Sequence, residues 1–220
     1  MPNHYFSQNG LTACCADTTI TLFWDKPAVA GAVENYTVLL DDVTAARTEK
    51  THCTLEGLHP ETSYTLFVQW RSGGIGELTV RTTPAKRRLD VTAAPYFAVG
   101  DGKTMNTAAL QKAMDDCGES QCVYFPAGVY MTGALRLHSN LELYLDEGAV
   151  LQGTADPEDY LPRIHSRFEG TEMECYSSLL NLGTLDYTAG PNCENVILRG
   201  KGTIASGGKL LASRIIESER

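Results

Sequence analysis

The stretch that decides the fold runs from Val99 to Gly153. It opens with VGDGKTMNT (99–107) and an amphipathic segment, and continues with VYFPAGVY (123–130), TGALRL (132–137), LELYL (141–145) and GAVLQG (148–153). Glycine or asparagine follows these short apolar segments, and both residues accept the backbone angles of tight corners. A solenoid buries the apolar side chains of each coil against the next coil. The pattern therefore predicts the first coils of a parallel β-helix.

A helix is predicted just before these strands. Asn106 suits the N-cap position, because its side-chain oxygen can accept a hydrogen bond from the first helical turn. Apolar residues follow at helical spacing: Ala109, Leu110, Ala113, Met114 and Cys117. We expect this helix to cover the N-terminal end of the stack. The sequence GDGKT (100–104) lacks the spacing of a phosphate-binding loop, so it does not indicate nucleotide binding.

The N-terminal residues 1–84 predict a separate β-sandwich. Strand-like segments recur roughly every ten residues, which is typical of that architecture, at 19–24, 36–40, 53–55, 65–70 and 77–82. Residues 85–97 are expected to be a linker and a leading strand, and residues 98–220 the β-helix domain. The basic cluster 86–88 is more typical of a solvated connector than of a polyanion site.

Composition limits the classes of function. The chain has 27 acidic and 18 basic residues, a net charge of −9, so we expect no nucleic-acid partner. The sequence contains no apolar run of about 18 residues, so it predicts no membrane-spanning helix. The N-terminus lacks the features of a secretory signal, which predicts a cytoplasmic protein, with an extracellular or periplasmic location as the alternative. Seven cysteines without metal-binding spacing predict reduced thiols and no metal site.

Ordered motifs in the second half carry a family resemblance. They are VGDGKTxNTxAL (99–110), VxFPAGxYxTG (123–133), LxLxEGA (143–149) and NVxLxGxGTI (195–204). With them, residues 97–205 resemble the N-terminal part of the polygalacturonase-like glycoside hydrolases, which implies a right-handed parallel β-helix. Trp24 before a proline, together with LxPxTxY (58–64), makes residues 10–83 resemble a fibronectin type III domain. The expected fold class is all-β, and this domain order resembles certain exo-acting bacterial members.

The resemblance implies an enzyme that hydrolyses α-linked galacturonides of pectin without a metal or cofactor, with an oligo- or polygalacturonide as its partner. An inverting mechanism needs two carboxyl groups about 6.5–9.5 Å apart. The family carries them in Asn-Thr-Asp, Asp-Asp and Gly-His-Gly motifs downstream of the matched region. The pairs Asp41-Asp42 and Asp115-Asp116 lie in the sandwich and at the end of the helix. We therefore assign no catalytic residue in this chain and expect the chain alone to be inactive.

One segment, 157–186, shows little strand character and is rich in charged side chains. Loops often carry function, and arginine binds carboxylates through paired hydrogen bonds. The sequence RFEGxE (167–172) also resembles a stretch of exo-type members. The candidate substrate-binding residues are Arg163, Arg167, Glu169, Glu172 and Tyr176. The competing interpretation is a solvated insertion whose charges pair with one another.

Two other functions remain open at this point. One is a non-catalytic carbohydrate-binding or structural β-helix protein, such as a tailspike-like adhesin. The other is a pectate-lyase-type relative, which would need calcium-binding carboxylates and an arginine base. The oligomeric state and the choice between endo and exo action do not follow from the residues.

Overall fold

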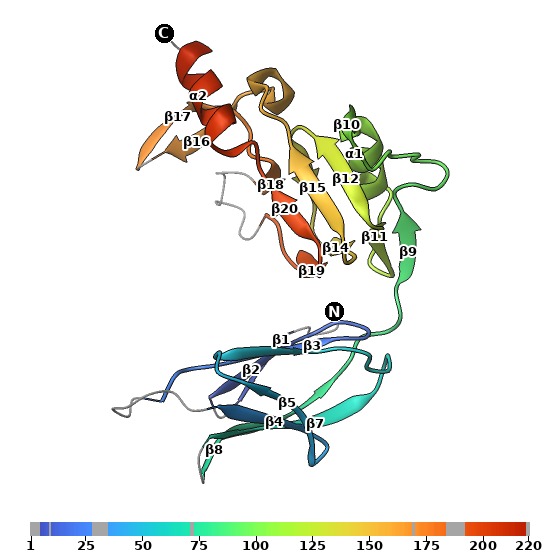
Figure 1. Cartoon of the computed structure of the whole chain (residues 1–220), viewed down its shortest axis with the longest axis vertical. Coiled ribbons are helices and arrows are strands. Elements are labelled where there is room, and N and C mark those ends of the chain that lie inside the picture. Colours follow the sequence, from blue (N-terminus) through green and yellow to red (C-terminus); the bar gives the residue numbers. More distant parts are fainter. Residues whose placement is uncertain are drawn as a thin grey trace. The chain divides into compact units, whose positions relative to one another are not determined.

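The computed structural model describes residues 5–8, 10–27, 35–70, 73–168, 170–183 and 192–218. The chain divides into two units, Met1–Lys86 and Arg87–Arg220 (Figure 1). Each unit has its own hydrophobic core. The division falls within the basic cluster, because Arg87 and Arg88 already belong to a strand of the second unit.

The first unit is a sandwich of two antiparallel four-stranded sheets, ordered β1-β2-β3-β6 and β5-β4-β7-β8. Trp24 and Tyr36 meet edge to face in its core, with ring centroids 5.3 Å apart. The Tyr64 hydroxyl accepts a hydrogen bond from the His59 amide, as in a tyrosine corner. The strands are β1 (Tyr5–Gln8), β2 (Leu11–Cys15), β3 (Ile20–Trp24), β4 (Tyr36–Leu40), β5 (Val43–Thr48), β6 (His52–Leu55), β7 (Ser63–Trp70) and β8 (Gly73–Arg81).

The second unit is a stack of coils in three parallel sheets, ordered β9-β11-β14-β19, β10-β12-β15-β20 and β13-β18. In the two four-stranded sheets each turn of the chain adds one parallel strand, and the third sheet takes strands from two of the turns, which is the arrangement predicted for a β-helix. The strands are β9 (Arg87–Asp90), β10 (Asp101–Met105), β11 (Gln121–Phe125), β12 (Gly128–Thr132), β13 (Leu135–Leu137), β14 (Glu142–Leu145), β15 (Ala149–Gly153), β18 (Leu180–Leu182), β19 (Ile197–Gly200) and β20 (Thr203–Ala205).

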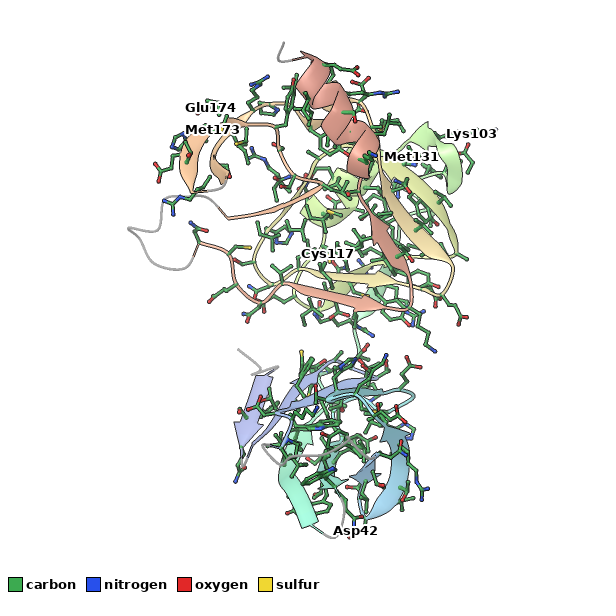
Figure 2. All side chains as sticks on the ribbon, turned by 60° about the vertical axis from the view of Figure 1, so that its left-hand side comes forward. Asp42, Lys103, Cys117, Met131, Met173 and Glu174 are labelled. Atoms are coloured by element: carbon green, nitrogen blue, oxygen red, sulfur yellow. The ribbon has the colours of Figure 1, made fainter. Side chains whose placement is uncertain are left out.

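Apolar side chains form columns along the inside of this stack. Strand register places Leu89, Val123, Leu143 and Leu198 one above another in successive coils. Val123 and Leu143, which lie between neighbouring coils, are fully buried. Cys117 is also enclosed in this core (Figure 2). The predicted fold class is therefore confirmed, and the coils are held together by burial of the apolar residues that the sequence pattern indicated.

The predicted helix is α1 (Thr107–Asp115), which buries Leu110, Ala113 and Met114 against the core. The predicted role of Asn106 was wrong in one respect: it is the N-cap residue, but its side chain makes no capping hydrogen bond. The side-chain oxygen instead accepts from the Val99 amide at 2.7 Å, and the amide group donates to the Thr104 carbonyl at 2.7 Å. Asn106 therefore fixes the loop that leads into the helix.

The outer face of the stack carries a ladder of aromatic and guanidinium groups. Tyr124 and Tyr144, in register on β11 and β14, are stacked with centroids 5.8 Å apart. The guanidinium of Arg88 lies 4.6 Å from the Tyr124 centroid, and that of Arg199 lies 4.5 Å from the Tyr144 centroid. Arg199 Nε also donates to Glu142 Oε1 at 2.5 Å, and Glu142 is only 1% exposed. The ladder thus joins four successive strands of one sheet.

The segment 157–186 contradicts the prediction of little strand character. It starts with the 3₁₀ helix η1 (Pro157–Tyr160) and forms an antiparallel hairpin of β16 (Ile164–Phe168) and β17 (Thr171–Cys175). The hairpin is an insertion between β15 and β18. The C-terminal segment forms helix α2 (Gly208–Ser218).

We predict that Arg199→Ala destabilises the second unit by about 3–5 kcal/mol, because it removes the guanidinium from a buried carboxylate. Hydrogen exchange of the β14 and β19 amides measures this loss without interference from the first unit. Arg136→Ala, on an exposed side chain of the same unit, is the matched control and should change the unfolding free energy little. Equal effects of the two substitutions would contradict the structural role of the Glu142–Arg199 pair.

Candidate functional site

The candidate substrate-binding residues gather on the hairpin of β16 and β17. Arg167 and Glu172 face each other across the two strands. Arg163 directly precedes β16 and Tyr176 directly follows β17, so both stand at the base of the hairpin. Glu169 lies outside the described residues. Two of the candidates are thus paired on the strands and two at the base.

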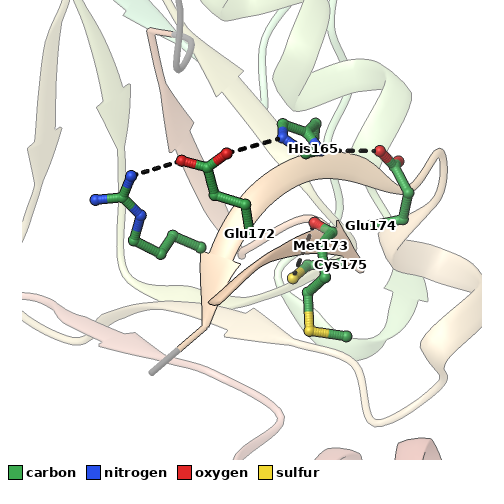
Figure 3. A network of polar contacts seen from close by, with 6 residues as sticks. His165, Glu172, Met173, Glu174 and Cys175 are labelled. Atoms are coloured by element: carbon green, nitrogen blue, oxygen red, sulfur yellow. Dashed lines mark hydrogen bonds and ion pairs between the residues drawn. The ribbon is translucent and has the colours of Figure 1, made fainter. Parts of the chain in front are cut away.

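The charged side chains of the hairpin form one network. Arg167 donates to Glu172 Oε1 at 2.6 Å. The two nitrogens of His165 lie 3.7 Å from Glu172 Oε2 and 3.2 Å from Glu174 Oε1. Figure 3 shows His165 between these two glutamates, and Figure 2 labels Glu174 and its neighbour Met173 on the hairpin.

The candidate set omitted His165 and Glu174, although both belong to this network. Alternate residues of a strand point to one face. His165 and Arg167 therefore share a face with their cross-strand partners Glu174 and Glu172. The signal that would have revealed the pairing is the alternation of charges on both sides of Gly170, which has positive φ at the turn.

On this face the one arginine is already paired with a carboxylate. The hydrogen bond and charge of Arg167 hold the pKa of the Glu172 carboxyl below its usual range. Each of these side chains is more than half exposed, so water screens the ion pairs and their contribution to folding is small. An exposed carboxylate held in its ionised form is a poor general acid. The hairpin is therefore equipped to contact a polar ligand and lacks the environment for acid catalysis.

Arg163 and Tyr176 form a second pair at the hairpin base. The Arg163 guanidinium lies 4.5 Å from the centre of the Tyr176 ring. A guanidinium stacked on a ring keeps its in-plane N–H groups directed outward, where they can bind a carboxylate. The pair thus places a stacked arginine at the base of the hairpin.

Other classes of site receive no support from the part of the chain that the structure describes. No group of three or more histidine, cysteine, aspartate or glutamate side chains there could hold a metal ion. Neither α1 nor α2 is long and apolar enough to cross a membrane. Burial raises the pKa of the Cys15 thiol to about 12.

We predict that Arg167→Ala raises the pKa of Glu172 toward that of an isolated glutamate, because it removes the main cause of the depression. The ion pair is present above the depressed pKa and is lost as the pH falls through it. Carboxyl NMR titration of Glu172 measures the shift. Arg163→Ala is the control and should leave the titration unchanged; an equal shift in both variants would refute the pairing.

Comparison with known families agrees with this architecture. Residues 92–156 match the family described as rhamnogalacturonase A/epimerase, pectate lyase-like. Residues 9–84 match the fibronectin type III domain. The first match covers β10 to β15 with helix α1, and the second covers the sandwich from β2 to β8.

Individual relatives extend across both units. The exo-poly-alpha-D-galacturonosidase of Dickeya chrysanthemi is 34% identical over 160 residues, which covers 70% of this chain and 26% of the relative. A probable polygalacturonase of Vitis vinifera is 31% identical over 152 residues, which covers 64% of this chain and 29% of the relative.

Among solved structures, the family 28 exopolygalacturonase of Yersinia enterocolitica matches 86% of this chain and 39% of its own, with a TM-score of 0.70 and 27% identity. The chain thus spans well under half the length of these relatives. The chain therefore joins a fibronectin type III domain to the first coils of a pectate-lyase-like β-helix similar to that of the polygalacturonases.

Proposed function

We propose that this chain is the N-terminal portion of an exo-acting glycoside hydrolase that cleaves α-linked galacturonides of pectin. The observation that carries the proposal is the similarity to the Yersinia exopolygalacturonase, which covers 86% of the chain. Neither unit alone is that long, so the match includes both the sandwich and the coil stack. The stretch that aligns with the Dickeya exo-poly-alpha-D-galacturonosidase is also longer than either unit, so it too includes parts of both.

The proposed reaction is hydrolysis with inversion. One carboxylic acid protonates the leaving oxygen while a second carboxylate, about 6.5–9.5 Å away, activates water. None of the motifs that carry these groups in the family stands in its proper context in this sequence, because the two Asp-Asp pairs lie in the sandwich and at the end of α1. The described coils accordingly serve as the foundation on which later coils would hold the catalytic pair. The reaction needs no metal or cofactor.

We propose that the hairpin contributes to substrate binding through Arg163, Arg167, Glu169, Glu172 and Tyr176. A uronate carries a carboxylate, and the net charge of −9 repels it unless basic groups gather locally. Arg163, stacked on Tyr176, would bind this carboxylate through its guanidinium. Arg167 would bind one by exchanging its partner Glu172 for the substrate.

A chimera tests this function. Residues 1–205 replace the aligned N-terminal part of the Yersinia exopolygalacturonase, so that the remaining coils supply the catalytic groups. We expect the chimera to release short products from the ends of polygalacturonate, as an exo-acting enzyme does. A folded chimera that cuts the polymer at internal bonds, or not at all, would contradict the proposal.

The same chimera tests the hairpin. Arg163→Ala should raise KM for oligogalacturonides about 10- to 150-fold with little change in kcat, since a charge-assisted hydrogen bond contributes about 1.5–3 kcal/mol. Arg136→Ala, another exposed arginine outside the hairpin, is the control and should leave KM unchanged. If both variants behave like the parent chimera, Arg163 does not contact substrate.

A further inference from the structure

The base of the hairpin of β16 and β17 is held by buried polar groups that the proposed reaction does not use. Thr154 and Tyr160 precede the hairpin in the chain and Ser177 follows it, and they are 7%, 2% and 8% exposed. A buried polar group needs a hydrogen-bond partner, and each of these side chains has one. These partners show how the hairpin is attached to the coils.

Ser177 joins the two ends of the hairpin. Its backbone amide donates to the Tyr160 carbonyl, and its hydroxyl donates to the Pro162 carbonyl, both at 3.0 Å. Ser177 directly follows Tyr176, and Pro162 directly precedes Arg163. The hydroxyl therefore ties together the two chain segments that carry the stacked arginine and tyrosine.

Helix η1 anchors these ends to the coils. The Tyr160 hydroxyl donates to the Thr154 carbonyl at 2.7 Å, and the Thr154 hydroxyl donates to Asp159 Oδ2 at 2.6 Å. The Asp159 carbonyl also accepts from the Ala134 amide at 3.0 Å. A Cβ atom at Gly133 would lie 2.1 Å from this carbonyl oxygen, so only glycine lets η1 lie so close to the coil. The base of the hairpin is therefore fixed to the coil stack.

We propose that Ser177 is a positioning residue, which holds the stacked Arg163 and Tyr176 where the guanidinium meets a uronate carboxylate. An arginine side chain loses rotamer freedom when it binds a ligand, and a side chain that is already held loses less. The Tyr176 ring holds the guanidinium, and the Ser177 hydroxyl holds the segments that carry both. The inference rests on the proposed function for its ligand, and adds to it the group that sets the position of the pair.

The first test uses the 220-residue chain and the NMR signal of the Arg163 Nε proton. A proton over the face of an aromatic ring has a lower chemical shift than one in water, so Tyr176→Ala should move this signal to that of a free arginine. Ser177→Ala should move it in the same direction, because the two segments are no longer tied. Ser139→Ala is the matched control, since it removes a serine hydroxyl that accepts from the Glu194 amide between β13 and β14, and should leave the signal unchanged.

The second test measures KM for trigalacturonate in the chimera with the Yersinia coils. Ser177→Ala should raise KM about 2- to 10-fold and leave kcat unchanged, as expected for the loss of one hydrogen bond that acts on binding alone. Residues that act through one contact have non-additive effects, so Ser177→Ala should raise KM no further in a chimera that already carries Arg163→Ala. Ser139→Ala should again have no effect.

Hydrogen exchange of the β11 and β14 amides reports whether each variant keeps its fold. If Ser177→Ala does not fold, Tyr160→Phe takes its place, since it removes the hydroxyl that bonds to Thr154 and keeps the ring. An unchanged KM in Arg163→Ala would overturn the proposed binding site itself. A raised KM in Arg163→Ala, combined with an unchanged KM, an unmoved Arg163 signal or a fully additive effect of Ser177→Ala, would overturn the positioning role alone.

Discussion

The register of the parallel coils is the constraint on which the second unit depends. Val123, Leu143 and Leu198 occupy one interior column, and a shift by a single residue would turn this column to the outer face. The same register stacks Tyr124 on Tyr144 and brings Arg199 to the buried Glu142 on the outside. Inner burial and the outer ladder therefore specify one alignment of the strands.

Much of the fold could be predicted from local sequence patterns, and the elements that were missed have physical reasons for it. The coil strands and α1 were predictable because their apolar residues alternate or recur with helical spacing. Strand β5 was not, because it is almost wholly exposed and has no buried face. The hairpin of β16 and β17 was missed because cross-strand ion pairs, rather than apolar alternation, mark it. The hydrogen bond that Asn106 accepts from the Val99 amide was not predicted, because it depends on the conformation of the loop between the two residues.

The position of the candidate site in the chain could be predicted, but not all of its residues could. The sequence located the charged segment, while the strand register was needed to add His165 and Glu174. In this network Arg167 is already paired with Glu172, whereas the guanidinium of Arg163 is stacked on Tyr176. Under the proposed function, the coils would provide a rigid base, the insertion would provide binding groups, and acid–base chemistry would require carboxylates from further coils.

The most direct test of this account is turnover by the purified, folded 220-residue chain on polygalacturonate, followed as the release of reducing ends. The account predicts no release above a heat-denatured control, because the two carboxyl groups of the inverting mechanism are not among its motifs. Sustained release that remains with the protein through purification would contradict it, and would require a catalytic pair within the coils described.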